Sequence, residues 1–139
     1  MLYRLLRQFE SIENGLSAND PLSDESVYNH ITSRGKDGFQ SKFISTCGSL
    51  TAVLKFTGNR KDPRIAKIWE KNLPVVKIDL RESKNWEKYY TKYSEGDTSL
   101  GSDFEEVLLV SYVPETHVEL LTKSDWPASQ CPTWLKFEQ

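Results

Sequence analysis

The chain of 139 residues contains only two cysteines, Cys47 and Cys131, and no Cys-x-x-Cys pair. Two cysteines are too few for a disulfide scaffold or a structural zinc site, although a single bridge in a secreted protein is compatible with them. No apolar run approaches the roughly 18 residues that a membrane span needs. The N-terminus also lacks the apolar segment and cleavage site of a signal peptide. We therefore expect no metal, no membrane partner, and a location in the cytoplasm or, after delivery, in the cytosol of a target cell.

Length and composition predict a single α+β domain. The chain is 37% hydrophobic and 12% aromatic, which is typical of a globular protein with its own core. Strand patterns are dispersed among short helical patterns without regular β-α-β spacing, and this favours the α+β class. We expect the domain to span residues 1–121 and residues 122–139 to form an irregular tail packed on it.

Local patterns predict the elements of this domain. Strands are expected over residues 2–6, 42–45, 75–80, 105–110 and 117–121. Helices are expected over residues 8–14, 21–34, 49–56, 62–73 and 84–93. The helix starts are marked by Ser49, a good cap, and by the Asp62-Pro63 pair. Gly15 suits a left-handed position after the first helix, and residues 94–102 are expected to form a loop.

The net charge of −2 conceals an uneven distribution. Residues 55–93 hold eleven Lys and Arg against five acids, a net of +6, and residues 94–139 hold two bases against nine acids, a net of −7. Pairing of the two halves in space would explain this asymmetry. Alternatively, the basic region with its interleaved aromatic residues binds an anionic partner. A non-enzymatic module that uses residues 55–93 to bind nucleic acid or protein is therefore one candidate function.

Three polar positions, far apart in sequence, indicate a chemical site. Arg4 follows Tyr3 in the first expected strand, Ser45 and Thr46 end the second, and Glu106 lies at the start of a later one. In this order they resemble the Arg-Ser-Glu class of ADP-ribosyltransferases, bacterial toxins similar to cholera toxin. The resemblance covers roughly residues 2–121 and includes Tyr3-Arg4, Ile12–Leu16, His30–Gly35, Phe43–Thr46, Ser49–Ala52 and Glu106–Leu109. It implies an ADP-ribosyltransferase-like domain with split antiparallel or mixed sheets and short helices.

The resemblance also implies an activity: mono-ADP-ribosylation of a macromolecular acceptor, protein or nucleic acid, with NAD as co-substrate. Transfer to water instead would make the protein an NAD glycohydrolase. A toxin or effector of this kind is expected to have an antitoxin or immunity partner. The family's roles map onto residues that catalyse the reaction (Arg4, Ser45, Glu106), bind NAD (Tyr3, Arg4, His30, Ser45, Thr46) and contact the acceptor (Phe104, Tyr93, Lys88).

The chemistry explains why these residue types are needed. The forked donors of an arginine suit the phosphates or ribose of NAD. Hydroxyl and backbone groups hold the nicotinamide end against a strand. The transition state resembles an oxocarbenium cation, which a fixed carboxylate stabilises as in glycosidases.

Two departures from the family pattern bear on the site. Cys47 stands where the family has a third hydroxyl, and the catalytic glutamate lacks the family's Glu or Gln two positions earlier. Side chains two apart share a strand face, so Glu105 and Glu106 define mutually exclusive registers, of which we prefer Glu106. An arginine acceptor is disfavoured in either register. A third candidate function is a small ribonuclease toxin with His30 as base and Arg4 beside the phosphate, although a second acid or base is missing.

Overall fold

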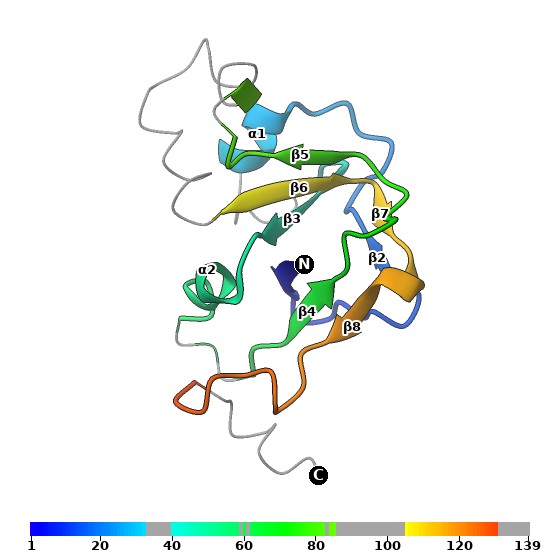
Figure 1. The fold of residues 1–139 in the computed structure, drawn as a ribbon. Helices are drawn as coiled ribbons and strands as arrows, with labels where there is room; N and C mark the ends of the chain where they lie inside the picture. The colour runs from blue at the N-terminus through cyan, green and yellow to red at the C-terminus, as the bar shows by residue number, and fades with distance from the viewer. Residues whose placement is uncertain (33–39, 59, 61, 83, 86–104, 131–139) are drawn as a thin grey trace.

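A computed structural model describes residues 1–32, 40–58, 60, 62–82, 84–85 and 105–130 of the chain (Figure 1). The strands are β1 (Leu2–Leu5), β2 (Leu16–Ser17), β3 (Phe43–Cys47), β4 (Ile65–Ile68), β5 (Lys77–Asp79), β6 (Glu106–Val110), β7 (Tyr112–Val113) and β8 (Val118–Leu120). The helical segments are α1 (Val27–Thr32), α2 (Leu50–Leu54) and the 3₁₀ turn η2 (Glu115–His117). The predicted α+β class is confirmed, and all pairings between these strands are antiparallel.

The main sheet has the strand order β5-β6-β3-β1-β4-β8 and consists of two halves joined at one point. β3 pairs with β6 over five positions, and β1 pairs with β4 over four. Between β3 and β1 the register has one pair, Tyr3 with Cys47. The halves β5-β6-β3 and β1-β4-β8 therefore part directly beyond this pair, and we call this place the sheet junction.

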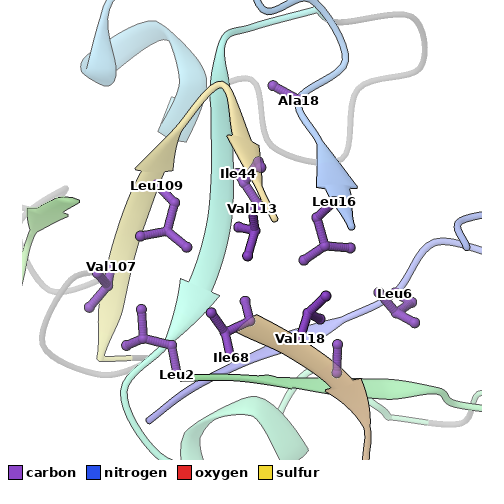
Figure 2. Close-up of a cluster of buried hydrophobic side chains, with 11 residues drawn as sticks. Leu2, Leu6, Leu16, Ala18, Ile44, Ile68, Val107, Leu109, Val113 and Val118 are labelled. Atoms are coloured by element: carbon purple, nitrogen blue, oxygen red, sulfur yellow. The ribbon is translucent and has the colours of Figure 1, made fainter. Parts of the chain in front are cut away.

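One face of the sheet encloses the largest core cluster. Side chains from both halves meet there with those of the β2-β7 ribbon, as Figure 2 shows for Leu2, Leu16, Ile44 and Val113. Most of these residues are aliphatic and expose almost no surface. This cluster holds together the two halves that the backbone joins at a single pair.

The opposite face carries the two helices. Val27 of α1 packs with Phe43 and Leu108 over the β5-β6-β3 half. α2 packs on the other half in a cluster that includes Ile65 and Trp126. The burial of Trp126, which exposes 6%, attaches the described part of the expected tail to the domain. Both residues of the junction pair, Tyr3 and Cys47, belong to the cluster that contains α2.

Two expected helices are wrong. Residues 8–14 form turns and irregular backbone, with Phe9 exposing 91% of its surface instead of packing on a core. The Arg64 guanidinium binds the carbonyls of Arg7, Gln8 and Glu10, which a helix would have used for its own hydrogen bonds. Gly15 does adopt the predicted left-handed backbone (φ 82°), but it leads into β2 instead of capping a helix.

The helix expected over residues 62–73 is replaced by β4. Ile65, Ala66 and Ile68 are fully buried because β4 pairs with β1 on one side and β8 on the other and is covered on both faces. A strand buried on both faces shows a continuous apolar run, which periodicity does not distinguish from a helix. The isoleucines also favour an extended backbone.

The remaining expected elements are close to those observed. β1, β3, β5 and β6 lie within two residues of the predicted bounds, and Ser49 caps α2 by accepting a hydrogen bond from the Ala52 amide (3.1 Å). α1 begins later than predicted, at Val27, because Asp20 and Ser23 hold the preceding residues in turns. The expected strand over 117–121 is confirmed as β8. The expected loop over 94–102 and all but the start of the helix over 84–93 lie outside the described residues.

Candidate functional site

Arg4 bridges the two halves of the sheet at the junction. Its Nη1 donates a hydrogen bond to the carbonyl oxygen of Ser45 (2.9 Å). This carbonyl points away from β6, because backbone groups of Thr46 and Ile44 face that strand and alternate with those of Ser45. Since β1 has already parted from β3, the guanidinium takes the place of a backbone partner. Arg4 thus satisfies a strand carbonyl that the split of the sheet would leave open.

His30 reaches the same serine from α1. Its Nε2 lies 2.7 Å from Ser45 Oγ, and its Nδ1 lies 2.5 Å from Ser41 Oγ. The imidazole also packs edge-on against Phe43, with the ring centroids 5.6 Å apart. His30 is therefore held in one orientation between two hydroxyls. Ser45 in turn is contacted twice, at its carbonyl by Arg4 and at its hydroxyl by His30.

Glu106 lies beside Ser45 on the neighbouring strand. It is paired with Cys47, and Ser45 is paired with Leu108, so Glu106 is the diagonal neighbour of Ser45 on the same sheet face. Such neighbours have Cβ atoms roughly 7 Å apart. The Glu106 side chain exposes only 2% of its surface. The register thus places a buried carboxylate close to the hydroxyl that His30 contacts.

Arg4 and Glu106 approach Ser45 differently. The register continues from Glu106 through Cys47 to Tyr3, so side-chain alternation directs Tyr3 to the face of Glu106 and Arg4 to the other face. The Arg4 guanidinium reaches the backbone edge of Ser45 at the junction. A ligand that contacts both Arg4 and Glu106 would have to span this edge.

Glu105 has a structural environment that differs from that of Glu106. Its backbone is left-handed (φ 50°), and it lies before the first residue of β6. Its Oε2 accepts a hydrogen bond from Ser49 Oγ (2.5 Å), and its carbonyl accepts one from the Gly48 amide (2.8 Å). Glu105 therefore fastens the start of β6 to the start of α2, and Glu106 is the glutamate that shares the face of Ser45.

The other predicted site residues are dispersed. Thr46 points to the opposite face, where its hydroxyl donates to the Val107 carbonyl (2.6 Å). Tyr3 packs against the cluster that contains α2. The predicted acceptor-binding residues Phe104, Tyr93 and Lys88 lie outside the described part of the chain. Of the predicted positions, the structure brings together Arg4, His30 and Ser45 by contact, and Glu106 by register.

Sequence reasoning missed two residues of this site. Ser41 is 3% exposed and orients His30, and its position two before Phe43 and four before Ser45 predicts a shared face that could have revealed it. Glu10 binds the Arg4 Nε through both carboxylate oxygens (3.2 and 3.3 Å). No sequence pattern indicates Glu10, because its position depends on a turn that the sequence suggested was helical.

Much of the described positive charge of residues 55–93 is paired. Lys67 forms salt bridges with Glu119 (3.2 Å) and Asp125 (3.0 Å), which belong to the acidic half. The hydrogen bond to Asp125 raises the pKa of Lys67 in spite of its partial desolvation. Pairs within the basic region join Lys77 to Glu70, Arg81 to Asp79 and Lys84 to Glu82. Pairing in space therefore accounts for part of the charge asymmetry.

Comparison with known proteins gives a fold neighbour. No protein-family profile matches the chain, and no curated protein does. The solved structure named EcPltA is similar with a TM-score of 0.53 and 16% sequence identity, over 84% of this chain and 71% of EcPltA. At this identity the likeness concerns the fold alone. In the described residues, no helix is long and apolar enough to cross a membrane, and no group of three or more His, Cys, Asp or Glu is arranged to hold a metal ion.

Proposed function

We propose that the protein is a mono-ADP-ribosyltransferase with an ADP-ribosyltransferase-like fold, which uses NAD to modify a macromolecular acceptor, protein or nucleic acid. One observation carries the proposal: Arg4 and His30 both hydrogen-bond to Ser45, and Glu106 lies beside it on the paired strand. These four residues come from β1, α1, β3 and β6. Arg4 reaches the Ser45 carbonyl from the other face of the sheet, and this meeting of polar groups at the sheet junction is not explained by packing of the apolar core.

The donor would be held by Arg4, Ser45 and His30. Arg4 Nη1 is bound to Ser45, and no described residue accepts a hydrogen bond from Nη2, which leaves this nitrogen for a phosphate oxygen. Ser45, fixed by His30, orders the surface beneath nicotinamide, and the His30 ring supports the adenosine side. The site binds the dinucleotide through donors that are already oriented, which lowers the entropy cost of binding.

Glu106 would act on the reaction itself. As the bond between the ribose and nicotinamide breaks, positive charge develops on the ribose, and a nearby carboxylate stabilises it. The acceptor nucleophile then forms the new bond to the ribose carbon and loses its proton. A carboxylate that exposes 2% of its surface is little screened by water, so its charge acts strongly. NAD binding has to open a path to this buried group.

Incubation of the protein with labelled NAD and a cell extract tests the proposal. Label in protein or nucleic acid supports transfer, and nicotinamide release without label indicates a glycohydrolase. The matched variants are Arg4→Lys, which removes the guanidinium fork, and Arg60→Lys, which changes an exposed arginine that donates to the Leu6 carbonyl. We expect activity to be lost in the first and kept in the second. Absence of any NAD turnover by the wild-type protein refutes the proposal.

The two alternatives receive less support. A binding module needs positive charge that is available to a partner, yet Lys67, Lys77 and Arg81 are paired with acids. A ribonuclease with His30 as base needs a ring nitrogen facing substrate, and both nitrogens contact serine hydroxyls. Steep salt dependence of nucleic-acid binding without NAD turnover would favour the module.

A further inference from the structure

Glu10 contacts the Arg4 guanidinium from the end of a tight turn over residues 7–10. The Glu10 amide donates to the Arg7 carbonyl (3.0 Å), and the Arg7 amide donates back to Glu10 Oε1 (3.0 Å). The Glu10 side chain exposes only 6% of its surface, and that of Arg4 exposes 12%. This buried carboxylate contacts the Arg4 Nε (3.2 and 3.3 Å), the Arg7 amide and, at 3.5 Å, the Arg7 guanidinium.

The turn itself is attached to the sheet by Arg64. This arginine immediately precedes β4, and its carbonyl accepts a hydrogen bond from the Leu6 amide (2.9 Å). Its guanidinium donates to the carbonyls of Arg7 (2.8 Å), Gln8 (3.0 Å) and Glu10 (2.8 Å). Three backbone carbonyls bound by one planar group leave the turn little freedom. The position of the Glu10 carboxylate is therefore set by β4, a central strand of the fold.

The charge of Glu10 is maintained by its surroundings. Burial alone raises the pKa of this carboxyl, but the Arg4 charge and the hydrogen bonds from the Arg7 amide and Arg4 outweigh that effect, so the pKa lies below its ordinary value. Glu10 thus remains ionised throughout the neutral range. Its partner Arg4 is then engaged by a charge-assisted hydrogen bond, which is stronger than a neutral one.

We infer that Glu10 is the positioning residue for Arg4 in the proposed transferase, an inference that rests on that proposed function. The Glu10 carboxylate accepts a hydrogen bond from Arg4 Nε, and the Ser45 carbonyl accepts one from Nη1. With these two sides fixed, Nη2 is presented to a phosphate oxygen of NAD in one orientation. Without Glu10, the long Arg4 side chain would regain rotamers that NAD binding must freeze again.

A positioning role for Glu10 predicts a particular kinetic effect of its replacement. Arg4 contacts parts of NAD that do not react, so its orientation affects the ground state and the transition state alike. Loss of such uniform binding raises KM and leaves kcat nearly unchanged. Replacement of a residue that only supported the fold would lower the amount of active protein or the unfolding temperature, without raising KM at constant kcat.

NAD turnover should be measured for the wild-type protein, E10A, E10Q and the control E13Q. We expect KM for NAD to rise roughly tenfold in E10A, the scale of one charge-assisted hydrogen bond. E10Q keeps the shape and one acceptor, so its KM should lie between those of wild type and E10A, with kcat within about threefold of wild type. Glu13 lies on the same segment with an exposed side chain, so E13Q should behave as wild type.

The outcomes separate the inference from the proposed function. An unchanged KM in E10A and E10Q, with an active wild type, overturns the role of Glu10 and leaves the transferase standing. A loss of kcat in the well-folded E10Q with unchanged KM also overturns it. Circular dichroism identifies a variant that fails to fold. If E10A does not fold, the KM of the near-isosteric E10Q decides whether Glu10 positions Arg4. A wild-type protein without NAD turnover refutes the proposed function, and the positioning role with it.

Discussion

Replacement of Glu106 by glutamine would separate a catalytic carboxylate from a structural one. Glutamine keeps the size and one oxygen acceptor of the side chain but removes the negative charge. The charge matters to the proposed reaction only when the ribose becomes cationic. Nicotinamide release should therefore slow by roughly two to three orders of magnitude, the scale of one electrostatic contact in a closed site. Affinity for NAD should change little, because the ground-state ribose carries no such charge.

The structure also predicts the stability of this variant. Glu106 exposes 2% of its surface, and burial of an amide carries a smaller desolvation cost than burial of a carboxylate. The free energy of unfolding of Glu106→Gln should therefore fall by no more than about 1 kcal/mol, the net worth of one hydrogen bond. Slow turnover in a protein of normal stability is the expected combination. Urea unfolding and single-turnover measurement of nicotinamide release test both parts.

Glu105→Gln is the matched control. Glu105 precedes β6 and accepts a hydrogen bond from Ser49, which a glutamine oxygen can still accept. We expect its activity to remain near that of wild type. Loss of turnover in Glu105→Gln but not in Glu106→Gln would show that the catalytic register is wrong by one residue. Normal turnover in both variants would refute the assigned chemistry.

Three further predictions concern stability. Gly15→Ala should lower the free energy of unfolding, measured in urea, by roughly 2 kcal/mol or more, because φ is 82° and a Cβ would come within 2.1 Å of a β7 carbonyl oxygen. Gly58→Ala should lower it by only about 1 kcal/mol, because φ is 47° but no atom lies within 4 Å of the added Cβ. Ser49→Ala should cost about 1–2 kcal/mol by the same assay, because it removes both the cap of α2 and the hydrogen bond to Glu105. Glu10 and Asp79 have pKa values below their ordinary 4.5 and 3.8, so in acid the unfolded chain binds more protons than the folded protein does. The melting temperature should therefore fall as the pH drops below about 4.5. Above that pH these two groups should not affect it.

The parts of the fold that the sequence predicted depend on local chemistry. Ser49 was expected to cap a helix, and it does so through its own side chain within one turn. The composition and alternation of residues 75–80 predict a strand, and β5 (Lys77–Asp79) lies within that range. In such segments the local conformational preference and the final packing agree, so the sequence pattern is sufficient to predict the element.

The parts that it did not predict depend on distant partners. β4 shows apolar residues at helical spacing, yet the strands on either side of it determine that Ile65–Ile68 is extended. Residues 7–10 contain acceptable helix formers, but Arg64, over fifty positions away in the chain, binds the carbonyls of the turn. Tertiary contacts of this kind override local propensity and leave no signal in a single sequence.

The candidate site follows the same division, and this bears on how it could work. The resemblance to a family pattern predicts Arg4, His30 and Ser45 as site residues, but it does not indicate Glu10, which binds Arg4, or Ser41, which contacts His30. The orienting groups lie on turns and strand ends, whose geometry depends on the whole fold. Because the two halves of the sheet meet in one residue pair, the Arg4–Ser45 contact adds a side-chain link at the point where the backbone ladder stops. Any ligand that binds Arg4 and Glu106 together would therefore also bridge the two halves of the sheet, which predicts that NAD protects the amides of β1 and β3 from hydrogen exchange more than those of β5.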